Sequence, residues 1–337
     1  YYYGGGESDF PIEKAYPFLK DSFFPDVKAM VCLTCSCEPY QMACTILRKI
    51  GNINISPASA ERITKEVGGI LVKKEDKDVE AAMVGQVKKR EDTNREIMGI
   101  SMDGCCIRTI EEWREAKNGV IFDVCHDAKG KPHAVAKSYI SRIENSEEFG
   151  KRLYTEAKQR NSEAAKKIIV VGDGARWIWE EATLHFPESV QIVDWYHAKE
   201  HLWKAAELIF GSREKEESKE WIKKTRNILF SGEVESLAEE MAKECKRQNK
   251  KITDELKTEQ NYFVKNKDRM QYSRFEKLGY PIGSGTVESA CKNLVQIRMK
   301  RCGMKWTEEG AHAVLKLRFM LLSDRWNEVE GNCLVAA

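Results

Sequence analysis

The sequence predicts an α/β (α+β) fold in which a mixed sheet is interrupted by an all-helical insertion and preceded by a small helical N-terminal domain. Between residues 97 and 143 the apolar residues alternate as they do in strands, and the β-branched run 168–172 is typical of a fully buried strand. From 195 to about 274 the pattern becomes helical and rich in Lys and Glu. That long helical block interrupts an otherwise alternating arrangement of strands and helices.

The first predicted region, 1–95, is helical. Residues 1–30 are aromatic and Gly-rich and then turn-like around three prolines. A helix is expected over 40–50, and Ser56-Pro57 predicts the start of another that stops at Gly68. Two short helices joined by 51–54 indicate a possible helix-turn-helix that binds DNA. The highly charged stretch 74–95 is interpreted as a linker or an exposed helix.

The second predicted region, 96–200, is the first part of a catalytic core. We expect strands at 97–107, 119–124 and 134–143, a helix at 146–159, a strand at 168–172, a helix at 175–186 and a strand at 190–193. This is the element order of the RNase H fold, with a mixed sheet. The helical insertion follows at 201–278, and helices at 279–330 complete the core, with a break near Gly303 in the stretch 285–322.

Composition narrows the class of protein. Of 337 residues, 42% are hydrophobic and 32% charged, which is typical of a soluble globular protein. No run approaches the ~18 apolar residues of a membrane span, and no signal peptide is visible. Eleven scattered cysteines predict a reducing cytoplasm. Because the sequence starts at Tyr1 without Met, we expect an N-terminal part to be missing.

Three neighbouring cysteines suggest a metal site. Cys32, Cys35 and Cys37 lie close together, but a second Cys or His pair at zinc-finger spacing is missing unless Cys44 completes it, and no His lies nearby. A zinc site is therefore disfavoured. Cys105 and Cys106, just after Asp103, are interpreted as small buried residues and not as nucleophiles.

Three acids are the candidate catalytic and metal-binding residues. Asp103 follows a short apolar run, Asp173 follows the buried run 168–172, and Glu288 stands one turn into an expected helix; a glycine lies close to each. A carboxylate at a strand end points into an open crevice while the strand behind it stays rigid. Any one of them alone is more commonly a turn or cap residue. Together they would hold two Mg²⁺ (or Mn²⁺) ions for phosphoryl transfer.

A second cluster directly follows the strand at 190–193. Asp194 is followed by His197, and His201 lies one helical turn further on. Such a histidine could ligate a metal, orient a carboxylate or contact a phosphate. No Glu follows His197 in the metalloprotease arrangement, so a zinc protease is disfavoured.

Basic residues are concentrated after Glu288. Eight Lys/Arg lie between 292 and 325 against three acids, a local excess of five positive charges that would suit a phosphate backbone. The alternative is an ordinary solvated helix face. The predicted DNA contacts are the first five of these residues: Lys292, Arg298, Lys300, Arg301 and Lys305.

Four sequence blocks together carry a family resemblance. They are Asp103-Gly, Asp173-Gly-Ala-Arg-Trp-Ile, Asp194-Trp-Tyr-His-Ala-Lys-Glu-His-Leu and Pro281-Ile-Gly-Ser-Gly-Thr-Val-Glu-Ser-Ala-Cys-Lys, continued by Gln296-Ile-Arg-Met-Lys-Arg-Cys-Gly-Met-Lys-Trp. In this order they resemble bacterial insertion-sequence DDE transposases of the Kra type, which have an RNase H fold and are related to the Mutator superfamily. The resemblance covers roughly residues 95–326.

The resemblance implies a reaction and a set of roles. Asp103, Asp173 and Glu288 would be the DDE acids, and Asp194 and His197 match the Asp-x-x-His signature of Mutator-like enzymes. The implied activity is Mg²⁺-dependent cleavage at transposon ends and joining of the 3′-hydroxyl to target DNA. Trp195, Tyr196 and Trp203 could stack on a base, although core packing is the commoner role of such aromatics. A homodimer or higher oligomer in the bacterial cytoplasm, associated with the nucleoid, is expected.

The front of the chain departs from the family. A family member is expected to carry a cysteine-bearing segment ahead of the region of resemblance, and the front segment Tyr1-Tyr-Tyr-Gly-Gly-Gly has no cysteine. The chain is then either truncated or a domesticated DNA-binding protein that no longer cuts. A small-molecule phosphohydrolase is a further alternative, but the basic excess and the long insertion favour a polymer substrate.

Overall fold

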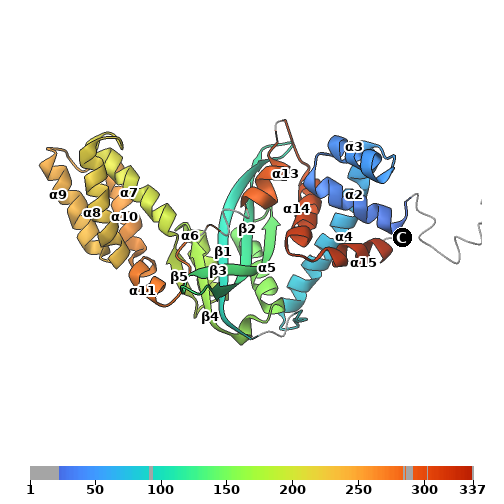
Figure 1. Cartoon of the computed structure of the whole chain (residues 1–337), viewed down its shortest axis with the longest axis horizontal. Helices are drawn as coiled ribbons and strands as arrows, with labels where there is room; N and C mark the ends of the chain where they lie inside the picture. Colours follow the sequence, from blue (N-terminus) through green and yellow to red (C-terminus); the bar gives the residue numbers. More distant parts are fainter. Residues whose placement is uncertain (1–22, 91–93, 284, 286–290, 302, 336–337) are drawn as a thin grey trace, which may run out of the picture.

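A five-stranded mixed sheet lies between two groups of helices in the computed structural model (Figure 1). The structure describes residues 23–90, 94–283, 285, 291–301 and 303–335. The insertion lies on one side of the sheet, and helices from the two ends of the chain lie together on the other. The predicted α/β fold class is confirmed at this level.

Three antiparallel strands and two parallel strands make up the sheet. β1 (Arg95–Arg108), β2 (Trp113–His126) and β3 (Pro132–Arg142) are joined by short turns, as antiparallel neighbours can be. β4 (Ala165–Gly172) runs parallel to β1, and β5 (Val190–Val193) parallel to β4. Parallel neighbours need crossovers, which α5 (Ser146–Gln159), the short η2 (Ser162–Ala164) and α6 (Arg176–His185) provide. The resulting strand order is β3-β2-β1-β4-β5.

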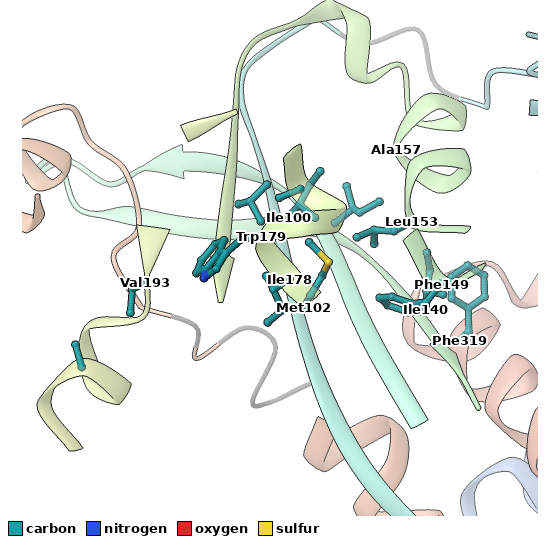
Figure 2. Close-up of a cluster of buried hydrophobic side chains, with 14 of the residues drawn as sticks. Ile100, Met102, Ile140, Phe149, Leu153, Ala157, Ile178, Trp179, Val193 and Phe319 are labelled. Carbon is teal, nitrogen blue, oxygen red and sulfur yellow. The ribbon is translucent and has the colours of Figure 1, made fainter. Parts of the chain in front are cut away.

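Both faces of the sheet are buried. Ile100, Met102 and Ile140 pack on one face with Phe149 of α5 and Trp179 of α6 (Figure 2). Along β4 the side chains alternate: Val170 joins this cluster, whereas Ile169 and Val171 join a second cluster with residues of the C-terminal helices. A strand covered on both faces explains why 168–172 is continuously apolar.

The N-terminal helices α2 (Pro25–Cys37), α3 (Tyr40–Gly51) and α4 (Pro57–Met83) pack with α14 (Glu308–Leu322) and α15 (Trp326–Val335) (Figure 1). We call these five helices the helical body. The predicted start of α4 is confirmed, because the Ser56 hydroxyl accepts a bond from Ser59 N at 3.1 Å and Pro57 opens the helix. The predicted stop at Gly68 is wrong. A β-carbon added there would lie 2.6 Å from Cβ of Ala313, so this glycine permits a close helix crossing.

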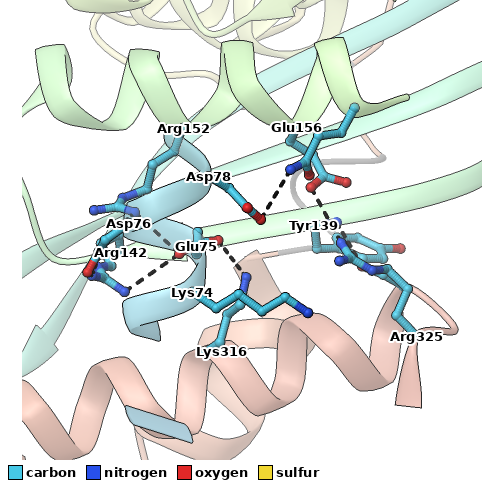
Figure 3. Close-up of polar contacts among 12 residues, drawn as sticks. Lys74, Glu75, Asp76, Asp78, Tyr139, Arg142, Arg152, Glu156, Lys316 and Arg325 are labelled. Carbon is cyan, nitrogen blue, oxygen red and sulfur yellow. Dashed lines mark hydrogen bonds and ion pairs between the residues drawn. The ribbon is translucent and has the colours of Figure 1, made fainter. Parts of the chain in front are cut away.

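The charged second half of α4 is neither a linker nor a simple exposed helix, because two of its acids pair with several cations (Figure 3). Lys316 of α14 lies 2.6 Å from Glu75, and Arg152 of α5 lies 3.4 Å from Glu75 and 2.7 Å from Asp76. Burial alone would raise the pKa of Glu75, but the charges of Lys316 and Arg152 outweigh it and lower that pKa. The network fixes α4 to the sheet layer.

Glu156 of α5 forms a neighbouring ion-pair centre. It binds Arg90 and lies 3.5 Å from Arg325 (Figure 3). Burial opposes its ionisation, but the two guanidinium groups prevail and lower the pKa of Glu156 to about 2. The ionised form is therefore the one the fold selects.

The insertion is helical, as predicted. It comprises α7 (Trp195–Phe210), α8 (Glu216–Ser231), α9 (Val234–Arg247), α10 (Asp254–Lys265), the short η3 (Lys267–Arg269) and α11 (Tyr272–Lys277). The chain enters and leaves the insertion at one place, because Trp195 N, at its start, donates to the carbonyl of Ile282, just after its end, at 2.9 Å. After it come the π-helix η4 (Cys291–Gln296) and α13 (Ile297–Met299), and Gly303 has a positive φ of 75° at the predicted break. Within the described residues, no helix combines the length and apolarity needed to cross a membrane.

Candidate active site

Asp103 and Asp173 stand in matching register on neighbouring parallel strands. Ser101 of β1 pairs with Val171 of β4, and each acid is the second residue beyond that pair. β4 ends at Gly172, directly before Asp173, while β1 continues past Asp103 beside β2. Both acids are half-buried. The strand pairing thus brings two carboxylates predicted from distant parts of the sequence to one place on the sheet.

Backbone amides hold one oxygen of each carboxylate. Oδ1 of Asp103 accepts a bond from Gly104 N at 2.7 Å, and Oδ1 of Asp173 accepts one from Ala175 N at 2.8 Å. Gly174 has a φ of 103°, which suits glycine and turns the chain sharply after the second acid. These bonds orient the carboxylate of Asp103 within β1 and that of Asp173 at the end of β4.

Asp194 lies beside the end of β4. Its backbone N–H donates to the carbonyl of Gly172 at 2.7 Å, its side chain is fully buried, and Oδ1 caps α7 by accepting from His197 N at 2.6 Å. A β-carbon added to Gly283 would lie 3.7 Å from Oδ2 of Asp194. The segment that leads toward Glu288 therefore passes this acid. Glu288 itself lies outside the described residues.

Tyr262 of the insertion contacts the turn at Asp173 and is held by His201, which is held in turn by Glu259; we call these three residues the latch. The Tyr262 hydroxyl donates to the carbonyl of Asp173 at 2.8 Å, and its ring stacks on His201 with centroids 3.7 Å apart. Nδ1 of His201 lies 2.5 Å from Oε2 of Glu259. Burial, and then the charges of Asp173 and Asp194, raise the pKa of Tyr262, so its hydroxyl stays protonated and remains a donor.

The sequence prediction missed Tyr262 and Glu259. Tyr262 is 89 residues from Asp173 and stands in a polar helical block, where no local spacing signals a contact with a strand end. In the sequence, His201 is notable only because it lies one helical turn after His197. Burial, reinforced by the charge of His197, lowers the pKa of His201 despite the opposing carboxylate of Glu259.

His197 and the aromatics of α7 have separate environments. His197 is partly exposed, with Nδ1 3.5 Å from Glu200. Trp195 packs against Tyr272 with centroids 4.8 Å apart and belongs to the insertion core, and Trp203 is half-buried there. Tyr196 is 60% exposed, and Lys199 Nζ lies 4.4 Å from its ring centroid. Of the three aromatics considered for base stacking, Tyr196 is the one that faces solvent.

The predicted DNA contacts divide into interior and exposed residues. Arg298 is 1% exposed, its Nε donates to the carbonyl of Cys35 at 2.8 Å, and its guanidinium lies 4.8 Å from the Trp306 ring centroid. This placement argues against Arg298 as a phosphate contact, because its cation already stabilises the helical body. Lys316 and Arg318 of the same basic stretch are also buried, at 8% and 5%.

Two of the remaining candidates face solvent and one is paired. Lys300 and Lys305 are exposed, and Lys300 Nζ lies 3.8 Å from Sγ of Cys105 on β1. Arg301 lies 2.6 Å from Glu38. The side chain of Lys292 lies outside the described residues. Lys300 is the candidate cation that contacts the strand carrying Asp103.

Metal-binding groups do not gather in the described part of the chain: no three His, Cys, Asp or Glu side chains there are placed to hold an ion. Cys32, Cys35 and Cys44 are instead buried among apolar residues. Cys32 and Cys333 of α15 are free thiols joined by a hydrogen bond. Asp103 and Asp173 do supply the carboxylate oxygens that Mg²⁺ prefers. Their oxygens fit part of a shared site whose third predicted ligand, Glu288, falls outside the described ranges.

Comparison with known proteins places the chain in a family. The model of the uncharacterised protein family UPF0236 matches residues 25–331, and the chain belongs to that family. No curated protein matches the sequence.

Proposed function

We propose that this member of UPF0236 is a DNA transposase with an RNase H-like core, which cleaves transposon ends and joins strands by two-metal phosphoryl transfer. The observation that carries the proposal is the matching register of Asp103 and Asp173 on β1 and β4. Acids at matching positions of two neighbouring parallel strands are where a shared pair of cations would bind a scissile phosphate.

The topology supports an RNase H-like core. The strand order β3-β2-β1-β4-β5, with three antiparallel strands followed by two parallel ones, agrees with the element order that suggested this fold. The helical insertion leaves the core after β5 and returns at Ile282. This position lets an insertion contact the acids without interrupting the sheet.

Asp103, Asp173 and Glu288 are the proposed ligands of two Mg²⁺ or Mn²⁺ ions. When bound, such ions lower the pKa of an attacking water or 3′-hydroxyl and stabilise the leaving oxygen. The chain's own part is to orient two carboxylates with the amides of Gly104 and Ala175. We assign positioning roles to Asp194 and His197, because Asp194 joins the end of β4 to the first turn of α7.

A polymer substrate is favoured over a small phosphate ester. Tyr196 presents an exposed ring beside Asp194, and Lys300 presents an exposed cation near Asp103. Aromatic faces and cations along one path are what a nucleic-acid strand requires. Pairing of two transposon ends by a homodimer or higher oligomer, in the bacterial cytoplasm, belongs to the same proposal.

The test is cleavage and strand transfer with the full chain on labelled DNA that carries the sequences flanking its gene, in Mg²⁺ or Mn²⁺. Asp103→Asn, Asp173→Asn and Glu288→Gln should each reduce the rate on the order of a thousandfold while DNA binding is retained. Glu239→Gln, an exposed acid on α9, is the matched control. Wild-type rates in the three variants would refute the acid assignment. Tight DNA binding without any cleavage by the wild type would favour the domesticated alternative.

A further inference from the structure

A hollow of about 770 Å³ opens beside the turn that carries Asp173. Its walls come from α6 on one side and from the end of α10 and η3 on the other. Gly174, the residue after Asp173, forms part of its rim. The hollow thus lies within one residue of a proposed catalytic acid, yet nothing in the proposed chemistry uses it.

Positive charge predominates in this hollow. Arg176, Lys265 and Arg269 line it, against the single acid Glu180. Arg176 is 91% exposed and pairs with Glu180 at 2.6 Å. Across the described ranges, neither Lys265 nor Arg269 forms an ion pair with a carboxylate: Arg269 donates to the neutral Gln191 at 2.7 Å. Two cations are therefore available to an anion.

Trp179 forms part of the wall of the hollow. Its ring is 7% exposed, and the Arg269 guanidinium lies 4.8 Å from the ring centroid. The indole N–H is buried and is therefore not accessible to a ligand in the hollow. Because Arg269 covers the buried ring, a ligand here would meet the guanidinium and could not stack a base on Trp179.

We propose that this hollow binds a phosphodiester of a single DNA strand, next to the scissile phosphate that the proposed function assigns to Asp103 and Asp173. The inference rests on the proposed function and names a contact of that site. Guanidinium and ammonium groups, which Arg269, Arg176 and Lys265 supply, match the several acceptor oxygens of a phosphate. Contacts of this kind fix the path of a strand but read no sequence. The hollow therefore positions the strand without selecting its bases.

Binding is measured by fluorescence anisotropy with the full chain, a short labelled single-stranded DNA of arbitrary sequence, and EDTA to prevent cleavage. The double variant Lys265→Gln/Arg269→Gln should bind about tenfold more weakly at ~0.1 M salt, and its salt slope should fall by about 0.7 for each phosphate that the protein no longer neutralises. The matched control is Lys223→Gln/Arg226→Gln, two exposed cations of α8. Equal affinity of the two double variants would overturn the proposal.

A second double variant and a competition experiment complete the test. Lys265→Gln/Arg176→Gln changes only exposed side chains and should also weaken binding, so it decides the matter if replacement of Arg269 unfolds the protein. Inorganic phosphate and a thymidine dinucleotide are added as competitors; the dinucleotide should compete better, and equal competition would assign the hollow to free phosphate instead. Cleavage by Asp173→Asn tests the acids separately. Weaker binding by the hollow variants stands whatever that cleavage result is.

Discussion

Removing one hydroxyl from the latch tests whether the insertion positions Asp173. Tyr262→Phe keeps the ring that stacks on His201 and deletes only the O–H that donates to the Asp173 carbonyl at 2.8 Å. If the latch holds the turn, both stability and cleavage should decline. The change is the smallest one available at this contact.

The expected magnitude follows from the hydrogen bond that the variant cannot make. A net bond is worth about 1 kcal/mol, and a carbonyl left without its donor costs about 1–3 kcal/mol. For a chain of 337 residues, 1 kcal/mol corresponds to a shift in Tm of about 1.4 °C. We therefore expect Tm to fall by about 1.5–4 °C. Displacement of the Asp173 carboxylate should slow cleavage by about tenfold to a hundredfold.

Tyr272→Phe is the matched control. Tyr272 is a fully buried tyrosine of the same insertion, stacked on Phe230, but its hydroxyl has no hydrogen-bond partner in the part of the chain that the structure describes. Its removal should leave Tm unchanged or raise it slightly, with no effect on cleavage. Calorimetry and the cleavage assay are run on both variants. Equal Tm and equal rates for Tyr262→Phe and Tyr272→Phe would refute the latch.

Charge pairing and close packing in and beside the helical body lead to three further expectations, each measured by urea denaturation. Lys316→Met should lower the free energy of unfolding by about 3 kcal/mol, because it removes a buried cation and leaves the half-buried Glu75 without its 2.6 Å partner. Lys74→Met, at a 53% exposed side chain, should change the free energy of unfolding by less than ~1 kcal/mol, and similar values for the two variants would contradict the network. Because folding lowers the pKa of Glu156 from 4.5 to about 2, its ionised form contributes about 3 kcal/mol above pH ~4.5 that is lost as the pH falls toward 2. Glu156→Gln should therefore be less stable than the wild type at pH 7 and nearly equal to it near pH 2, and a constant difference would be inconsistent with this. Gly68→Ala should destabilise the protein by about 1–3 kcal/mol, because the added methyl group meets Ala313. Gly69→Ala, with open space around it, should stabilise the protein by up to ~1 kcal/mol. An increase in stability for both variants would exclude the close crossing.

Much of the core could be predicted because its signals are local. The strand at 190–193 and the helix at 146–159 have the predicted bounds, since a change of hydrophobic period marks each of them. Gly68 illustrates the opposite case. A helix stop and a close crossing both select glycine, and only the position of Ala313 in space decides between them.

The candidate site was predictable in part for a similar reason. Asp173 stands at a strand end beside glycines, which is a local pattern, and the register with Asp103 follows from pairing β4 with β1. Tyr262 could not be found, because its partner is a backbone carbonyl 89 residues away. A count of charges along the sequence does not show which of them are buried. Arg298 belongs to a strongly basic stretch of the chain but lies in the interior of the protein.

The helical body has a consequence for how the protein is made. Its first helices leave the ribosome early, but Arg298, which bonds to Cys35, follows 263 residues later, and Ala313 packs against Gly68 only after that. At 5–20 residues per second, α2 waits about 15–50 s for its partners. During that interval the apolar side chains of α2 are exposed to water unless another protein binds them. Nascent chains halted within the insertion should accordingly associate with chaperones through these first helices.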